Sequence, residues 1–95
     1  MEMFPFLTMF YKRISEDNRI STTHISLYMA LVQQWNLTGG KNPFPIRREE
    51  VMKAAKISAR LTYNKCLNNL QQFGYIKYIP SSNSFTQSII HLKDI

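Results

Sequence analysis

At Gly74 the hydrophobic pattern of the chain changes from a helical period to the alternation of strands. Before it, apolar residues recur every three or four positions over residues 59–73, which predicts a helix ended by Gly74 in the left-handed conformation. After it, residues 75–79 and 85–92 are rich in β-formers and are separated by the turn-forming residues 80–84. This order predicts a helix followed directly by a β-hairpin.

Three further helices and a short strand are predicted upstream. Apolar residues at helical spacing favour helices over residues 5–15, 21–36 and 47–55, the second with Ser21 as its N-cap. Residues 44–46 are predicted to form a short strand. Because this strand contains a proline, which lacks the N–H that pairs strands, we expect it at the edge of a sheet. The sequence therefore predicts one α+β domain over residues 1–95 with the order of a winged helix: an N-terminal helix (5–15), a helix (21–36), a helix-turn-helix (47–73) and a wing hairpin (75–92).

The predicted N-terminal helix carries apolar residues on nearly every side instead of in one stripe. Such a helix must be covered on more than one side, by its own domain or by a second copy of the chain. Four of its residues follow a 4-3-4 spacing that is typical of helix–helix seams: Met3, Leu7, Phe10 and Ile14. Burial within the chain and contact in a homodimer are equally good interpretations of this spacing. Because the helix carries more apolar surface than so small a domain can readily cover, we expect a homodimer.

The net positive charge of the chain is confined to residues 41–77. That stretch holds eight basic and two acidic residues, which gives +6, whereas residues 1–40 and 78–95 are each neutral. Clustered Lys and Arg gain affinity for a phosphate backbone because they replace condensed counterions, so a nucleic-acid partner is favoured. The alternative is a solvated face on a small basic protein.

Composition narrows the class of protein further. A chain of 95 residues with 44% hydrophobic residues has enough apolar side chains for one modest core and is not intrinsically disordered. Its one cysteine, Cys66, excludes an internal disulfide and is typical of a reducing cytoplasm. The apolar run over residues 3–11 is too short to span a bilayer. Basic residues follow this run, whereas in a secretory signal they precede it. We therefore expect a cytoplasmic protein with no membrane partner.

Residues 49–76 carry a motif with specific spacing. It comprises an acidic helix start (Glu49-Glu50), a small-residue helix end (Ala54-Ala55), Ile57-Ser58 in the turn, Leu67-x-x-Leu70, and Gly74-Tyr75-Ile76. This motif resembles that of winged helix-turn-helix DNA-binding proteins, and the whole chain resembles small bacterial winged-helix regulators and replication initiators of plasmids and mobile elements. The resemblance implies a bacterial, nucleoid-associated location. One extra residue between Ile57-Ser58 and Thr62-Tyr63 leaves the first residue of the recognition helix open by one position.

The outward face of the predicted helix 59–73 has the chemistry of a DNA-reading surface. Asn pairs with adenine, Lys approaches the acceptors of guanine, and an outward Leu contacts a thymine methyl. Asn is a poor helix former, which favours a functional face over a merely polar one. The residues predicted to read bases are Leu61, Thr62, Asn64, Lys65 and Asn68, with Gln72 on the same face and Asn69 at its flank. The residues predicted to face the core are Ala59, Tyr63, Cys66, Leu67, Leu70 and Phe73.

Phosphate contacts are predicted around this face, where the resemblance places them. The residues are Arg47, Arg48, Lys53, Lys56, Ser58, Arg60, Ser82 and Asn83. The predicted wing tip, residues 81–84, has no Arg or Lys, so we expect hydroxyl contacts to phosphate there and no insertion into a minor groove.

Residues with other chemistry are sparse. His24 and His91 stand apart from any cluster at metal-ligand spacing, so no metal site is predicted. Cys66, on the core side, is interpreted as a small buried residue and not as a nucleophile. Glu49 and Glu50 are adjacent on a helix and cannot face one site together. We expect no catalytic residue, no cofactor and no enzymatic activity.

The sequence therefore predicts sequence-specific binding of double-stranded DNA, as a transcriptional regulator or a replication-initiation accessory of a mobile element. The alternative is a winged-helix protein–protein module whose basic patch meets an acidic partner. The absence of basic residues from the predicted wing tip favours this alternative, and the Asn-rich outward face argues against it.

Overall fold

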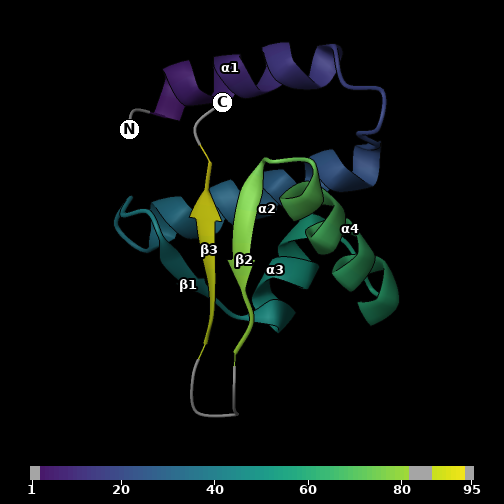
Figure 1. Ribbon diagram of the computed structural model, residues 1–95. Helices are drawn as coiled ribbons and strands as arrows, with labels where there is room; N and C mark the ends of the chain where they lie inside the picture. Colours follow the sequence, from purple (N-terminus) through teal and green to yellow (C-terminus); the bar gives the residue numbers. More distant parts are fainter. Residues whose placement is uncertain (1–2, 82–86, 94–95) are drawn as a thin grey trace.

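Four helices and three strands make up residues 3–81 and 87–93, the part of the chain that the computed structural model describes (Figure 1). In chain order they are α1 (Met3–Ser15), α2 (Thr22–Leu37), β1 (Phe44–Ile46), α3 (Arg48–Ala55), α4 (Arg60–Gln72), β2 (Ile76–Ile79) and β3 (Ser88–Leu92). The fold class is α+β, as predicted.

The ends of the elements differ from the sequence prediction by a few residues. Helix α1 begins two residues early, and Pro5 is accepted there because the first-turn N–H that it lacks has no helical partner. Arg47 and Ala59 are the N-cap residues of α3 and α4 and are not inside these helices. Ser21 caps α2 and Gly74 has φ +86°, so both of these predictions are confirmed.

The three strands form one antiparallel sheet in the order β1-β3-β2. Strand β1 is at an edge of the sheet, as its proline predicts, and Phe44 lies opposite Ile90. The side chain of Asn42 extends this pairing: its Nδ2 donates to the Leu92 carbonyl at 2.8 Å, and its Oδ1 accepts from the Leu92 N–H at 2.9 Å. Residues 82–86 of the predicted hairpin lie outside the described residues.

Helix α2 is the central element of the core and packs against α3, α4 and β1. The largest fully buried side chains are Tyr28, Tyr63, Tyr75, Phe10, Phe44, Leu27, Leu31, Leu67, Leu70, Ile76, Ile90 and Leu92. They come from α1, from α2, from the helix-turn-helix and from the sheet, so these elements share a single core. No helix of the described residues is long and apolar enough to cross a membrane.

Helix α1 lies along α2 (Figure 1). Aromatic side chains pack between the two helices. Phe10 is fully buried, and its ring stacks on that of Tyr28 with the centroids 4.0 Å apart. Phe6 is 6% exposed, whereas Met9 and Tyr11 are 47% and 53% exposed. Burial within the chain, one of the two predicted alternatives, therefore accounts for the aromatic side of α1, and a homodimer through its exposed side stays a prediction.

Candidate nucleic-acid interface

Helix α4 presents one buried and one exposed face. Tyr63, Cys66, Leu67 and Leu70 are buried against the core, as predicted. The five residues predicted to read bases are all exposed: Leu61, Thr62, Asn64, Lys65 and Asn68. Leu61 is 82% exposed, an unusual position for a large apolar side chain, and Gln72 is also exposed. The helical period therefore brings the predicted reading residues to the surface together.

One core-side prediction for α4 is wrong: Ala59 is exposed because, as the N-cap, it precedes the helix. Phe73, the C-cap, is half-buried and packs against the core, as predicted. Burial raises the pKa of the Cys66 thiol above its ordinary value, which does not favour a reactive thiolate.

The predicted phosphate contacts lie on α3, on the turn and at the start of α4. Arg47, Lys53, Lys56, Ser58 and Arg60 are exposed, as this prediction requires. Between the two helices, the backbone of Lys56 is left-handed (φ 61°) and the buried Ile57 anchors the turn in the core.

Arg48 differs from its neighbours. It is half-buried, and its Nη2 lies 3.5 Å from Oε1 of Glu49. An ion pair at the surface contributes about 0–1 kcal/mol, so a phosphate group has only a weak competitor at this position. The predicted wing contacts, Ser82 and Asn83, lie outside the described residues.

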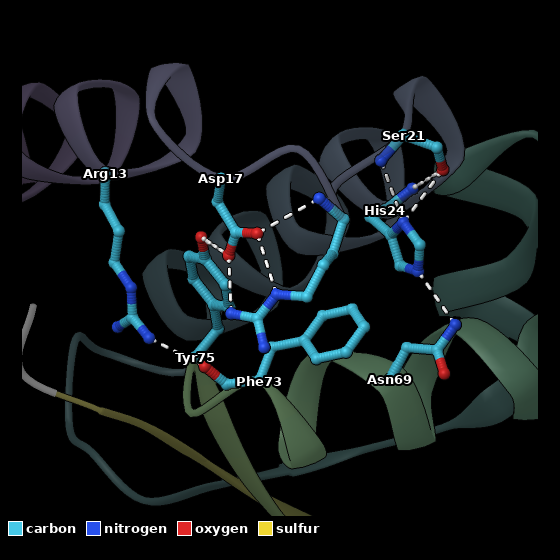
Figure 2. Close-up of polar contacts among 8 residues, drawn as sticks. Arg13, Asp17, Ser21, His24, Asn69, Phe73 and Tyr75 are labelled. Carbon is cyan, nitrogen blue, oxygen red and sulfur yellow. Dashed lines mark hydrogen bonds and ion pairs between the residues drawn. The ribbon is translucent and has the colours of Figure 1, made fainter.

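Asn69 lies at the flank of the exposed face, as predicted, but its side chain contacts α2. It is half-buried, and its side-chain amide lies 3.1 Å from Nε2 of His24 on α2 (Figure 2). His24 is 7% exposed and belongs to a capping box at the start of α2. Its Nδ1 accepts a hydrogen bond from the Ser21 N–H at 2.9 Å, while Ser21 Oγ accepts from the His24 N–H at 3.3 Å.

A second contact between the N-terminal segment and α4 is made by Arg13. Its Nη2 donates to the Phe73 carbonyl at 2.7 Å and its Nη1 to the Gly74 carbonyl at 3.4 Å. The guanidinium also lies over the Tyr75 ring, with Cζ 4.0 Å from the centroid. A cation at this position complements the negative end of the α4 dipole, and it satisfies carbonyls that have no helical partner.

Asp17, in the turn between α1 and α2, makes a further contact with the segment that follows α4. Its carboxylate accepts from Arg19 Nε at 2.8 Å, from Arg19 Nη2 at 2.9 Å and from the Tyr75 hydroxyl at 2.9 Å (Figure 2). These bonds, the pair with Arg19 first, hold the pKa of Asp17 well below its usual range. Burial and the bond to Asp17 raise the pKa of Tyr75 to about 12. The Arg19 guanidinium in turn lies 4.2 Å from the centroid of the Phe73 ring.

Sequence reasoning did not find this set of attachments. The Ser21-x-x-His24 spacing is a local signal for a capping box, with His in the place of the usual Glu or Gln. Arg13 and Phe73 are 60 positions apart, and Tyr75 and Asp17 are 58 apart, so no local pattern connects them. These residues hold the C-terminal half of α4 against α1 and α2.

Residues 3–81 and 87–93 contain no group of three or more His, Cys, Asp or Glu that could hold a metal ion. Comparison of the chain with known protein families, curated proteins and solved structures found no match.

Proposed function

We propose that the protein is a winged-helix protein that binds double-stranded DNA sequence-specifically, as a transcriptional regulator or a replication-initiation accessory of a mobile element. The observation that carries the proposal is the exposed face of α4. Five side chains able to contact base edges or a thymine methyl are exposed on it together, and the helix contains no acidic residue.

The surroundings of this face are suited to a phosphate backbone. Exposed basic residues lie at the start of α3, at its end, in the turn and at the first residue of α4: Arg47, Lys53, Lys56 and Arg60. The N-cap of α4, Ala59, makes no side-chain hydrogen bond to the helix, and the first turn of α4 holds no acidic residue, so the positive end of this helix dipole is available to an anion. Contacts of this kind fix the register of a protein on DNA and leave sequence reading to base contacts.

The arrangement of elements also supports the proposal. The helix-turn-helix of α3 and α4 packs on α2, and a C-terminal hairpin follows α4 directly. Strand β1, between α2 and α3, pairs with β3 of that hairpin. This arrangement is compatible with a winged helix, in which the second helix of the helix-turn-helix enters the major groove.

The first test is selection of bound duplexes from a random DNA pool, followed by titration of the most enriched duplex and of a scrambled one. We expect enrichment of one sequence. No binding to any duplex at low salt would refute the proposal and favour the protein–protein alternative.

Two variants then separate base reading from phosphate contact. Asn68→Ala is expected to lose about 1–3 kcal/mol on the enriched duplex and to leave binding to the scrambled duplex nearly unchanged. Arg47→Ala is expected to weaken both duplexes alike and to reduce the salt slope by about one. Arg47 makes no capping hydrogen bond, so its loss leaves the start of α3 as it was.

Gln33→Ala is the matched control, because Gln33 is an exposed amide on α2 and not on α4. It is expected to bind both duplexes as the wild type does. If Asn68→Ala weakens every duplex to the same extent as Arg47→Ala, α4 does not read sequence.

A further inference from the structure

The three-stranded sheet has one buried face and one face turned to solvent. Residues directly opposite each other in antiparallel strands lie on the same face, so the register assigns each residue to a face. The buried face carries Phe44, Ile46, Ile76, Ile90 and Leu92. The other, called here the outward face of the sheet, carries Pro45, Lys77, Ile79, Ile89 and His91. In Figure 1, α2 and α3 lie behind β2 and β3, and no helix lies in front of these strands.

Three apolar residues form a row across the outward face. Pro45 lies opposite Ile89, and Ile89 lies opposite Ile79, so each strand contributes one residue at the same level. Pro45 is exposed, Ile79 is 47% exposed and Ile89 is half-buried. A sheet with one solvated face ordinarily carries polar residues on that face. The strand propensity of isoleucine favours it in each strand separately, but it does not put apolar residues in register across all three.

Positive charge adjoins this apolar row. Lys77 and His91 lie opposite each other on the outward face, and both are exposed. Lys93, two residues after His91, is exposed as well. The described residues of the strands and their flanks, 44–46, 76–81 and 87–93, contain no acidic residue. The outward face therefore joins apolar surface to positive charge that no acidic side chain of these segments neutralises.

An acidic protein segment with a large apolar side chain complements both features. Its apolar side chain would remove the apolar row from water, and its carboxylates would pair with Lys77 and Lys93 at the rim. We propose that the outward face of the sheet is a docking surface for such a segment of another protein. None of its residues is among those assigned to DNA, so this surface and the DNA-binding face of α4 can be tested separately.

Two other occupants complement the outward face less well. A phosphate backbone pairs with lysines but offers little apolar surface, so the apolar row would stay uncovered. A second copy of the chain matches the apolar row but puts the same positive charge on both sides of the interface, and like charges oppose association. The acidic segment is the occupant that satisfies the apolar row and the lysines together.

The experiment selects binders from a library of random short peptides on the intact wild-type protein, with counter-selection on Ile79→Thr. Threonine keeps the β-branched shape and strand propensity of isoleucine and replaces an ethyl group by a hydroxyl. Lys77→Gln is the second variant, because Lys77 is exposed and its replacement leaves the core unchanged. Leu37→Thr is the matched control, because Leu37 is 65% exposed at the end of α2 and not on the sheet. Urea unfolding checks that each variant is folded.

We expect the selected peptides to combine acidic residues with a large apolar residue. Their affinity should fall about tenfold in Ile79→Thr, the effect of an interface residue that contributes to binding, and stay unchanged in Leu37→Thr. A smaller fall, with a weaker dependence on salt, is expected in Lys77→Gln. Asn68→Ala should bind the peptides as the wild type does, because α4 is not part of this surface.

The proposal would be overturned if no peptide is selected, if the selected peptides lack acidic residues, or if they bind Ile79→Thr as tightly as wild type. Loss of duplex binding in Ile79→Thr would assign the outward face to DNA instead. A wild type that is dimeric in sedimentation while Ile79→Thr is monomeric would assign it to a second copy. If no duplex is bound by the wild type, the proposed function fails, and the peptide measurements still decide whether the outward face is a docking surface.

Discussion

Replacement of Phe10 by alanine tests whether α1 is part of the core of its own chain. Phe10 is fully buried, stacks on Tyr28 at 4.0 Å and lies edge-on to Tyr75 at 5.9 Å. Loss of a buried phenylalanine side chain costs about 3–5 kcal/mol, because the transfer free energy is lost and a cavity remains. The two ring contacts place the loss for Phe10 at about 4 kcal/mol or above.

This loss is large relative to the stability of such a chain. Domains are stable by about 0.05–0.15 kcal/mol per residue, which for 95 residues is about 5–14 kcal/mol. Urea unfolding of small proteins has slopes of about 1–3 kcal/mol per molar, so a loss of about 4 kcal/mol lowers the midpoint by about 2 M. Circular dichroism at increasing urea concentration measures this shift directly.

Met9→Ala is the matched control, since Met9 precedes Phe10 and is 47% exposed. Its stability is expected to stay within about 0.5 kcal/mol of wild type. Equal, small losses in both variants would refute the packing of α1 within the chain. A loss in Phe10→Ala that disappears at higher protein concentration would show that α1 is buried by a second copy.

Three other predictions follow from the structure and the sequence. Gly74→Ala is expected to lose at least about 1 kcal/mol in urea unfolding, because φ is +86° and a Cβ would lie 3.2 Å from Arg13 Nη2; an unchanged midpoint would contradict this. Asp17→Asn is expected to be less stable than wild type above the ordinary aspartate pKa of 3.8, and the difference should shrink as pH falls below it, because the lowered pKa stabilises the fold only while the carboxylate is ionised. Urea midpoints across this pH range check the trend, and a constant difference would count against the Arg19 and Tyr75 contacts. A homodimer is expected in sedimentation, with the two copies of α4 about one DNA turn apart; a monomer at tens of micromolar would exclude it.

Local signals in the sequence predicted most of the fold because they act between neighbouring residues. Ser21 caps α2 through a residue three positions later, and Gly74 ends α4 through its own φ angle. The helical period of α4 likewise predicted which residues are exposed, because Tyr63, Cys66, Leu67 and Leu70 recur at core spacing. These predictions needed no knowledge of distant contacts.

The contact of Asn69 with His24 could not be predicted from local signals. The helical period puts Asn69 at the border between the buried and the exposed face of α4. Which way its side chain turns depends on His24, a partner 45 positions upstream. Histidine at the third position of a helix indicates a cap but does not indicate that its second nitrogen reaches another helix. Only the packing of α2 against α4 determines that the Asn69 side chain meets His24.

The two parts of the chain differ in what they contribute. Residues 1–40 carry no net charge, and their contribution is packing and hydrogen bonds: Phe10 enters the core, Arg13 holds the end of α4, and His24 contacts Asn69 in its last third. Residues 41–77 carry all of the net charge and the exposed face of α4. Both attachments are on the half of α4 nearest its C-terminus, and the buried Tyr63 and Cys66 hold its N-terminal half against the core. A proposed reading helix that is held along its whole buried side keeps its angle to the core without contributing its exposed side chains to folding.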